Sequence, residues 1–370
     1  MRVLQLITSL TFGGAERLLT DLVPRMTASG VDVRVLCVTS TMPLAPLLEQ
    51  QSISVASLHC NSSIYKMDAV MRAAREVTKL IEAFKPDVIH SHLYMADMLA
   101  RLASPRGSRL VTTLHGIERW WEQKHRLRSR AKTRIDSVLA SMRRTRAIAV
   151  SNSVAIAAHA ALSLPREKCR VVPNGTDLGR FQFNRRVPTA DPVIVQVGRL
   201  APEKGHRTSL QAFARLLQTH PRCRLRLVGH GPLEGELRAL ASSLGIEGRV
   251  EFLGARPDVP ELLASGHVFW MPSDSEALGI ACLEAMATGL PVIATRVGGI
   301  PEIVTHDVGH LVAPGDPEQL SATTARLLEN YPAALEMGRR ASARVVARYS
   351  IDTTARDYLN AYSDMVRDAW

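Results

Sequence analysis

Short apolar runs alternate with longer amphipathic stretches along this chain of 370 residues. Ten runs predict β-strands, at 3–8, 33–39, 87–92, 109–115, 147–151, 192–198, 223–229, 250–254, 267–273 and 291–295. Between them, helical periodicity predicts helices, including 15–29, 67–84, 208–220, 233–245 and 277–289. Strands that alternate with helices indicate an α/β fold, here with two Rossmann-like domains. The polar, proline-containing segment 178–192 is the expected linker.

Composition fits a globular protein, with 46% hydrophobic residues in a chain long enough for two cores. The chain contains no run of about 18 apolar residues, so no membrane-spanning helix is predicted. The start, MRVLQLITSLTFGGAE, fits a first strand and its loop better than a signal peptide. The five cysteines are scattered without a CxxC pair, which favours a reducing cytosol over a disulfide framework or a zinc site.

Two carboxylates, Glu276 and Glu284, flank the start of a predicted helix. The amides of Ala277, Leu278 and Gly279 are expected to be unpaired there and to form an anion site. A carboxylate on each side of an anion site suits a ligand with phosphate between two hydroxyl-rich groups, as in a nucleotide sugar. The competing interpretation is an exposed helix with solvated acids.

Two cations, Arg199 and Lys204, follow the strand predicted at 192–198 in the string RLAPEKG. At the carboxyl end of a strand, they can neutralise a diphosphate without a metal ion. A solvated basic loop is the alternative. No DxD motif is present, so we expect no required metal ion or other cofactor.

The E-x7-E spacing and the string GRLAPEKG together resemble family-4 retaining glycosyltransferases of the GT-B fold. Further similar segments are VVPNGTD, VGHGPLEGEL, LGARPDVPELL, TRVGGIPEIV and HLVAPGDPEQL. The resemblance implies two Rossmann-like domains facing a central cleft. It implies an acceptor-binding domain at 1–180, a nucleotide-sugar-binding domain at 188–350 and a helix at 351–370 that crosses back to the first domain. Many members have E-G-F-G where this chain has EALG, which leaves the shape of the sugar pocket open.

The resemblance also implies roles for the residues of the second half. Arg199 and Lys204 would grip the pyrophosphate, Glu276 the donor-sugar hydroxyls and Glu284 the ribose hydroxyls. Arg256 and the turn at 229–231 would lie near the base.

In the first half, the resemblance places Gly14, and with it Gly13, beside the donor phosphate and the acceptor. It places His115 beside the donor sugar. His90 and His92, in the segment HSH, are weaker candidates that would line the same site.

The implied reaction is sugar transfer from a nucleotide sugar with retention, in surface polysaccharide or glycolipid synthesis. A UDP-sugar is preferred by family frequency and GDP-mannose is possible, and the acceptor would be a glycan or a lipid-linked molecule. Two alternatives stay open. A GT-B nucleotide-sugar epimerase would need acid and base carboxylates in the first domain, and no such pair is evident. A silent nucleotide-sugar-binding or membrane scaffold would have little need for all of Arg199, Lys204, Glu276 and Glu284.

The net charge of +11 is concentrated in one stretch, since residues 101–150 contain thirteen Lys or Arg and three acids, a net of 13 − 3 = +10. Trp120 and Trp121 lie among these cations, which suits anionic lipid headgroups. We therefore expect peripheral contact through residues 118–146 with the inner, cytoplasmic face of a membrane. A solvated helix with its tryptophans in the core is the alternative, and no recognition motif for nucleic acid accompanies the patch.

Overall fold

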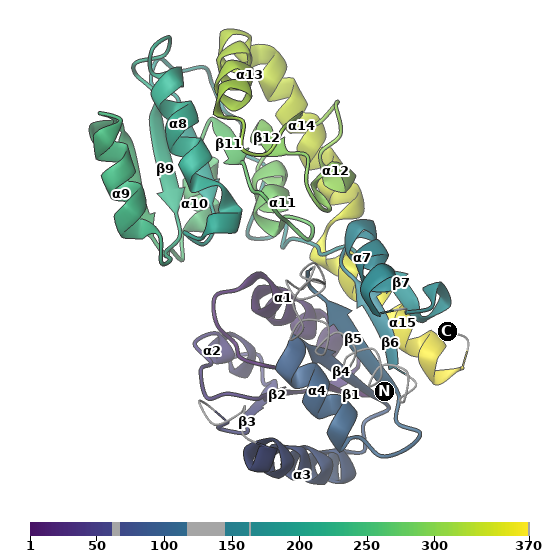
Figure 1. Ribbon diagram of the computed structural model, residues 1–370. Helices are drawn as coiled ribbons and strands as arrows, with labels where there is room; N and C mark the ends of the chain where they lie inside the picture. Colours follow the sequence, from purple (N-terminus) through teal and green to yellow (C-terminus); the bar gives the residue numbers. More distant parts are fainter. Residues whose placement is uncertain (61–66, 117–144, 163, 369–370) are drawn as a thin grey trace. The chain divides into compact units, whose positions relative to one another are not determined.

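The computed structural model describes residues 1–60, 67–116, 145–162 and 164–368. The chain folds into two compact units, Met1–Asn174 with Ile351–Trp370, and Gly175–Ser350. The division falls inside the segment VVPNGTD, six residues before the expected end of the first domain at 180. Both units are α/β, with a parallel sheet between helices, as the alternating pattern predicts (Figure 1).

In the described part of the first unit, seven parallel strands follow the order β3-β2-β1-β4-β5-β6-β7. The strands are β1 (Arg2–Ile7), β2 (Asp32–Cys37), β3 (Ser54–Ser57), β4 (Val88–His92), β5 (Leu110–Leu114), β6 (Thr145–Ala149) and β7 (Cys169–Val171). The helices are α1 (Gly14–Ala28), α2 (Ala45–Glu49), α3 (Met67–Phe84), α4 (Tyr94–Ala103), α7 (Asn152–Leu162) and α15 (Ile351–Val366).

Both faces of this sheet are covered because alternate residues of a strand point to opposite faces. Val3 packs into a core shared with α1 and α15, whereas Leu4 packs into a second core shared with α3 and α4. The helix α15 joins the first unit although it comes last in the sequence. Its buried residues recur every three or four positions, and Tyr358 and Tyr362 are fully buried. The C-terminal helix is therefore part of the core of this unit.

In the described part of the second unit, six parallel strands follow the order β10-β9-β8-β11-β12-β13. The strands are β8 (Val193–Val197), β9 (Arg224–Val228), β10 (Val250–Gly254), β11 (Val268–Met271), β12 (Val292–Thr295) and β13 (His310–Val312). The helices are α8 (His206–Leu216), α9 (Glu234–Ser243), α10 (Val259–Ala264), α11 (Ile280–Ala287), α12 (Ile300–Ile303), α13 (Pro317–Glu329) and α14 (Tyr331–Arg348). Among the described residues, no helix is both long and apolar enough to cross a membrane.

The segment 178–192, the expected linker, contains no helix or strand and lies in the second unit. Arg186 within it is buried, and its guanidinium donates to the carbonyls of Leu263, Gly266 and Thr288. Burial lowers the pKa of Arg186 to about 10, so the group stays charged at neutral pH. One arginine thus fastens this segment to the second unit.

Candidate active site

The carboxyl ends of β8 and β11 form the central edge of the second sheet, where these two strands are neighbours. The chain continues from β8 to β9 on one side and from β11 to β12 on the other, so this edge is a topological switch point. Arg199 and Lys204 follow β8, and Glu276 follows β11. Three predicted site residues therefore lie at the place where open α/β sheets bind ligands.

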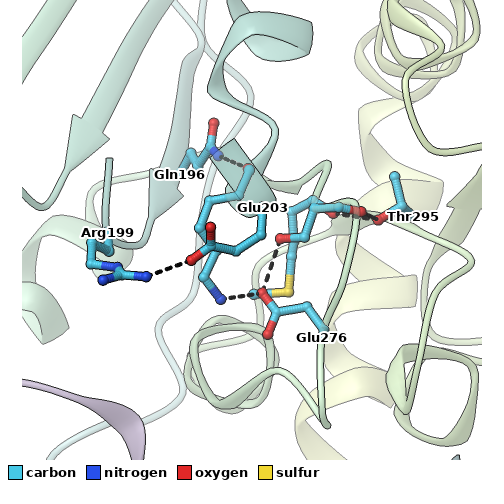
Figure 2. A network of polar contacts seen from close by, with 8 residues as sticks. Gln196, Arg199, Glu203, Glu276 and Thr295 are labelled. Carbon is cyan, nitrogen blue, oxygen red and sulfur yellow. Dashed lines mark hydrogen bonds and ion pairs between the residues drawn. The ribbon is translucent and has the colours of Figure 1, made fainter. Parts of the chain in front are cut away.

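Lys204 and Glu276 form the central ion pair of this edge, with Nζ 2.6 Å from Oε1. The Ser273 hydroxyl donates to the same Oε1 over 2.9 Å, as Figure 2 shows around Glu276. The carboxylate side chain is 9% exposed and the lysine side chain 27%, so the pair is accessible mainly from the lysine side. The structure joins two residues that are 72 positions apart in the sequence.

Buried polar side chains hold the two loops that carry this pair. Gln196 inside β8 donates to the carbonyl of Lys204 over 2.9 Å and accepts from the Ser209 hydroxyl over 2.5 Å. Thr295 at the end of β12 donates to the carbonyl of Ser273 over 2.5 Å. These residues are not among those predicted from the sequence. A glutamine within the otherwise apolar run VIVQV was the one visible signal.

Arg199 lies beside the pair but contacts a different acid, Glu203, at 2.7 Å (Figure 2). Its side chain is 63% exposed. The carbonyl of Glu203 accepts from the amide of Asp274, which links the loop after β8 to the loop after β11. Each of the two site cations is thus paired with a carboxylate, and Arg199 is the more exposed of them.

The helix α11 begins at Ile280, three residues later than predicted, with Gly279 as its N-cap. Gly279 has φ +95°, and a Cβ there would lie 2.5 Å from Ile300 Cδ1, so this position favours glycine. Leu278 is buried in the core, which leaves only its backbone for a ligand. Glu284 lies within α11 and is partly exposed, and Ala277 lies in the turn that leads to the helix.

Gly298 and Gly299, in the loop after β12, lie against the backbone of Glu276. Gly298 has φ +49°, and a Cβ there would collide with the carbonyl of Glu276. The amide of Gly299 donates to that carbonyl over 3.3 Å. The loop after β12 therefore packs directly against the backbone of the site glutamate.

Arg256 follows β10, the edge strand of the second sheet. Its guanidinium makes two bonds to Asp258, of 2.7 and 2.6 Å. The turn at 229–231 lies closer to the site, because Gly231 packs against the backbone of Leu200 and Leu200 donates to the carbonyl of His230. Of the two features predicted to lie near the base, the turn at 229–231 contacts the loop that carries Arg199. Arg256 is instead bonded to Asp258.

In the first unit, Gly13 and Gly14 follow β1 at the switch point between β1 and β4. Gly13 is the N-cap of α1, and a Cβ there would collide with the carboxylate of Glu16. Glu16 is buried and accepts from the Thr11 hydroxyl at 2.9 Å. The absent side chain at Gly13 makes room for the carboxylate of Glu16, which is not among the residues predicted for the site although it stands in GGAE.

His115 follows β5 and contacts His92, the last residue of β4, with Nε2 2.9 Å from Nδ1. Burial lowers the pKa of His115 to about 3 and holds the pKa of His90 and of His92 well below the ordinary value. The three histidines predicted for this half are therefore neutral and lie together at adjacent strands.

Residues 117–144 lie outside the described residues, and with them nearly all of the basic stretch 118–146 and both of its tryptophans. Within the described ranges, no group of three or more His, Cys, Asp or Glu side chains is placed to hold a metal ion.

Two family models match the chain: Glycosyltransferase Family 4 over residues 12–180 and Glycosyl transferases group 1 over residues 180–344. A D-inositol 3-phosphate glycosyltransferase of Acidothermus cellulolyticus is 31% identical over 316 residues, which are 76% of this chain and 68% of that protein. The chain belongs to the glycosyl transferases group 1 family. The site at the switch point of β8 and β11 lies within the group 1 match.

Two further proteins share this family likeness. An N-acetyl-alpha-D-glucosaminyl L-malate synthase of Bacillus anthracis is 33% identical over 193 residues, 52% of this chain and 50% of that protein. The chain therefore spans between half and about two thirds of the length of these curated relatives. Among solved structures, Anabaena Alr3699/HepE in complex with UDP and glucose has a TM-score of 0.83 and 25% identity, covering 98% of this chain and 99% of that one. The two-sheet architecture of this group 1 chain is thus the GT-B fold.

Proposed function

We propose that this chain is a retaining glycosyltransferase that takes a nucleotide sugar, preferably a UDP-sugar, as its donor. The observation that carries the proposal is the Lys204–Glu276 pair at the switch point of the group 1 half. The HepE complex with UDP and glucose supports UDP as the nucleotide. GDP-mannose is the second candidate donor.

The paired charges of the site suggest how a donor is taken up. A diphosphate brings negative charge that competes with Glu276 for Lys204 and with Glu203 for Arg199. Once Lys204 turns to the phosphate, the oxygens of Glu276 become free to accept from the hydroxyls of the donor sugar. Lys204 and Arg199 then stabilise the charge that develops on the leaving diphosphate. This exchange of partners couples donor binding to assembly of the sugar site.

The remaining predicted residues complete the donor site in this proposal. Glu284 accepts from the ribose hydroxyls, and Arg256 lies toward the base. The backbone at 277–279 binds phosphate through its amides. In the first unit, Gly13, Gly14 and His115 border the reacting groups.

The proposed reaction forms a bond between an acceptor oxygen and the anomeric carbon as the bond from that carbon to the phosphate oxygen breaks. The proton of the acceptor hydroxyl passes to the departing phosphate on the same face of the sugar, which retains the configuration. The acceptor is a glycan or a lipid-linked molecule of surface polysaccharide or glycolipid synthesis. Residues 118–146 bring the enzyme to the inner face of the membrane, and no metal ion is required.

Thermal unfolding with UDP, GDP and ADP in the presence of EDTA tests the proposal. A ligand that binds the folded state raises its stability by mass action, by about 2.7 kcal/mol at a hundred times its Kd. We expect a rise in Tm with UDP and release of UDP from a UDP-sugar when an acceptor is supplied. An epimerase would interconvert donors without an acceptor, and a scaffold would bind donor without releasing nucleotide. No shift with any of the three nucleotides would refute the proposed function.

A further inference from the structure

A chain of buried polar side chains crosses the first unit from His115 to the C-terminal helix. Its members come from β1, β4, α15, and β5 with the residue that follows it, and they are mostly buried. They are His115, His92, Gln5, Tyr362, His90, Thr113 and Tyr358. A polar network inside an otherwise apolar sheet is costly unless every member is bonded, so its arrangement needs an explanation.

The contacts next to His115 determine where its proton lies. His92 Nε2 is 2.8 Å from Gln5 Oε1, and His92 Nδ1 is 2.9 Å from His115 Nε2. The amide oxygen of Gln5 only accepts, so His92 carries its proton on Nε2. A neutral His92 then accepts at Nδ1, and His115 must donate from Nε2. This leaves Nδ1 of His115 unprotonated, as an acceptor without a partner among the described residues.

The far end of the network fixes the orientation of Gln5. Its Nε2 donates to the Tyr362 hydroxyl over 3.2 Å, while Tyr362 lies 2.5 Å from His90 Nδ1. His90 Nε2 contacts the Thr113 hydroxyl at 2.8 Å, and Thr113 contacts Tyr358 at 3.0 Å. If the Tyr362 hydroxyl donates to His90, every hydrogen-bond donor in this network faces an acceptor. In this arrangement the Tyr362 hydroxyl accepts from Gln5 Nε2, which leaves the Gln5 oxygen toward His92.

Two further observations agree with a pre-set arrangement. Burial lowers the pKa of His90, His92 and His115, which keeps all three rings neutral, as the donor and acceptor pattern requires. Leu93, directly after His92, has φ +70°, which is rare for a leucine. Such strain persists only where the surroundings enforce it and is concentrated at functional sites.

We infer that Gln5 and His92 are positioning residues that hold the proton of His115 on Nε2, so that its Nδ1 accepts from a hydroxyl of the bound substrate. The inference rests on the proposed function, since it takes His115 to contact the donor or the acceptor. It also gives the C-terminal helix a part in the reaction, because Tyr362 orients Gln5.

The direct test is the proton position on His115, read from two-bond ¹⁵N–¹H NMR spectra of ¹⁵N-histidine-labelled full-length protein. The signal of the His115 ring is identified as the one that is missing from the spectrum of His115→Gln. Gln5→Leu removes the acceptor that selects the His92 tautomer, and Gln5→Glu keeps an acceptor oxygen at that place. As a matched control, Thr324→Val in the second unit removes another buried hydrogen bond, the 2.9 Å bond from Trp270 Nε1.

We expect the wild-type protein and Gln5→Glu to carry the His115 proton on Nε2. In Gln5→Leu the Nδ1–H form becomes populated and release of UDP from UDP-glucose slows about tenfold or more, because a misplaced imidazole proton is costly in histidine-dependent catalysis. The Kd for UDP alone stays within about twofold in Gln5→Leu. Thr324→Val lowers the Tm but leaves the His115 signal and the turnover as in the wild type.

A wild-type proton on Nδ1 of His115, or an unchanged His115 signal in Gln5→Leu, would overturn the inference. If Gln5→Leu does not fold, the wild-type and Gln5→Glu spectra decide. Absence of UDP binding and turnover with the expected wild-type spectrum would count against the proposed function. A wrong proton position with intact turnover would count against this inference alone.

Discussion

Replacing Lys204 by methionine removes one charge from the site and keeps most of the side-chain volume. The carboxylate of Glu276, which is 9% exposed, is left with the Ser273 hydroxyl as its hydrogen-bonding side-chain partner among the described residues. In the proposed function, the change also removes one of the two cations that receive the diphosphate. The variant should therefore lose stability and nucleotide affinity together.

The size of both losses follows from the geometry. Breaking a fully buried pair costs about 3–5 kcal/mol, and partial exposure of Lys204 reduces this to about 1–3 kcal/mol. A charge-assisted hydrogen bond contributes about 1.5–3 kcal/mol, so the Kd for UDP should rise about 10- to 150-fold. In the double variant Lys204→Met/Glu276→Gln, the loss of stability should be smaller than in Lys204→Met, because no carboxylate is left without its cation.

Isothermal titration with UDP measures the affinity, and urea unfolding measures the stability. Lys204→Arg keeps the charge and should bind UDP more tightly than Lys204→Met. Lys79→Met breaks an exposed pair with Glu76 in the first unit and should change stability by less than about 0.5 kcal/mol. If folded Lys204→Met bound UDP with the wild-type affinity, the assignment of the diphosphate to this edge of the sheet would be wrong.

Three further predictions concern buried groups. Burial lowers the pKa of His90 and of His92 well below 6.5 in the folded state, so the unfolded state binds more protons in acid. The free energy of unfolding should be highest above about pH 6.5 and should fall below that pH by up to about 1.4 kcal/mol per pH unit for each ring. Urea unfolding at pH 7.5 and 5.5 should show a smaller change of this free energy with pH in His90→Gln than in the wild type. Both ring nitrogens of buried His206 have no partner among the described residues, so His206→Leu should raise the free energy of unfolding by about 1 kcal/mol; a clear drop in Tm would reveal a partner for the ring. Gly279→Ala should lower the free energy of unfolding by more than the about 1–2 kcal/mol expected for Gly245→Ala, because both glycines have positive φ but only a Cβ at Gly279 would meet Ile300. Equal Tm values for the two variants would contradict this reasoning.

Much of the architecture was readable from local pattern. All ten predicted strands occur, because each is an apolar run that must be buried on both faces of a parallel sheet. The edge strands β3, β7 and β13 were not predicted, since three or four residues with one partner strand carry too short a pattern. The start of α11 was placed three residues early, because apolar Leu278 looks helical in sequence but is buried in the turn before the helix.

The composition of the site was likewise visible in sequence, whereas its contacts were not. Arg199, Lys204 and Glu276 were each marked by a local string. Only the strand order, with β8 beside β11, brings Lys204 to Glu276, and periodicity carries no information on the order of parallel strands. The partner of Arg199 also depends on the folded structure, since the conformation of the loop after β8 brings Glu203 to its guanidinium.

What the sequence determined by itself was the α/β class, the family and the residue types of the candidate site, because these depend on burial, turn geometry and short strings. Only the tertiary structure decided which side chains form hydrogen bonds and ion pairs with one another. In the sequence, Gln5 interrupts an apolar strand and Tyr362 is a core position of a helix. Folding places Gln5 Nε2 3.2 Å from the Tyr362 hydroxyl and Gln5 Oε1 2.8 Å from His92 Nε2. Such contacts join residues up to 357 positions apart, and only the packing of α15 on the sheet creates them.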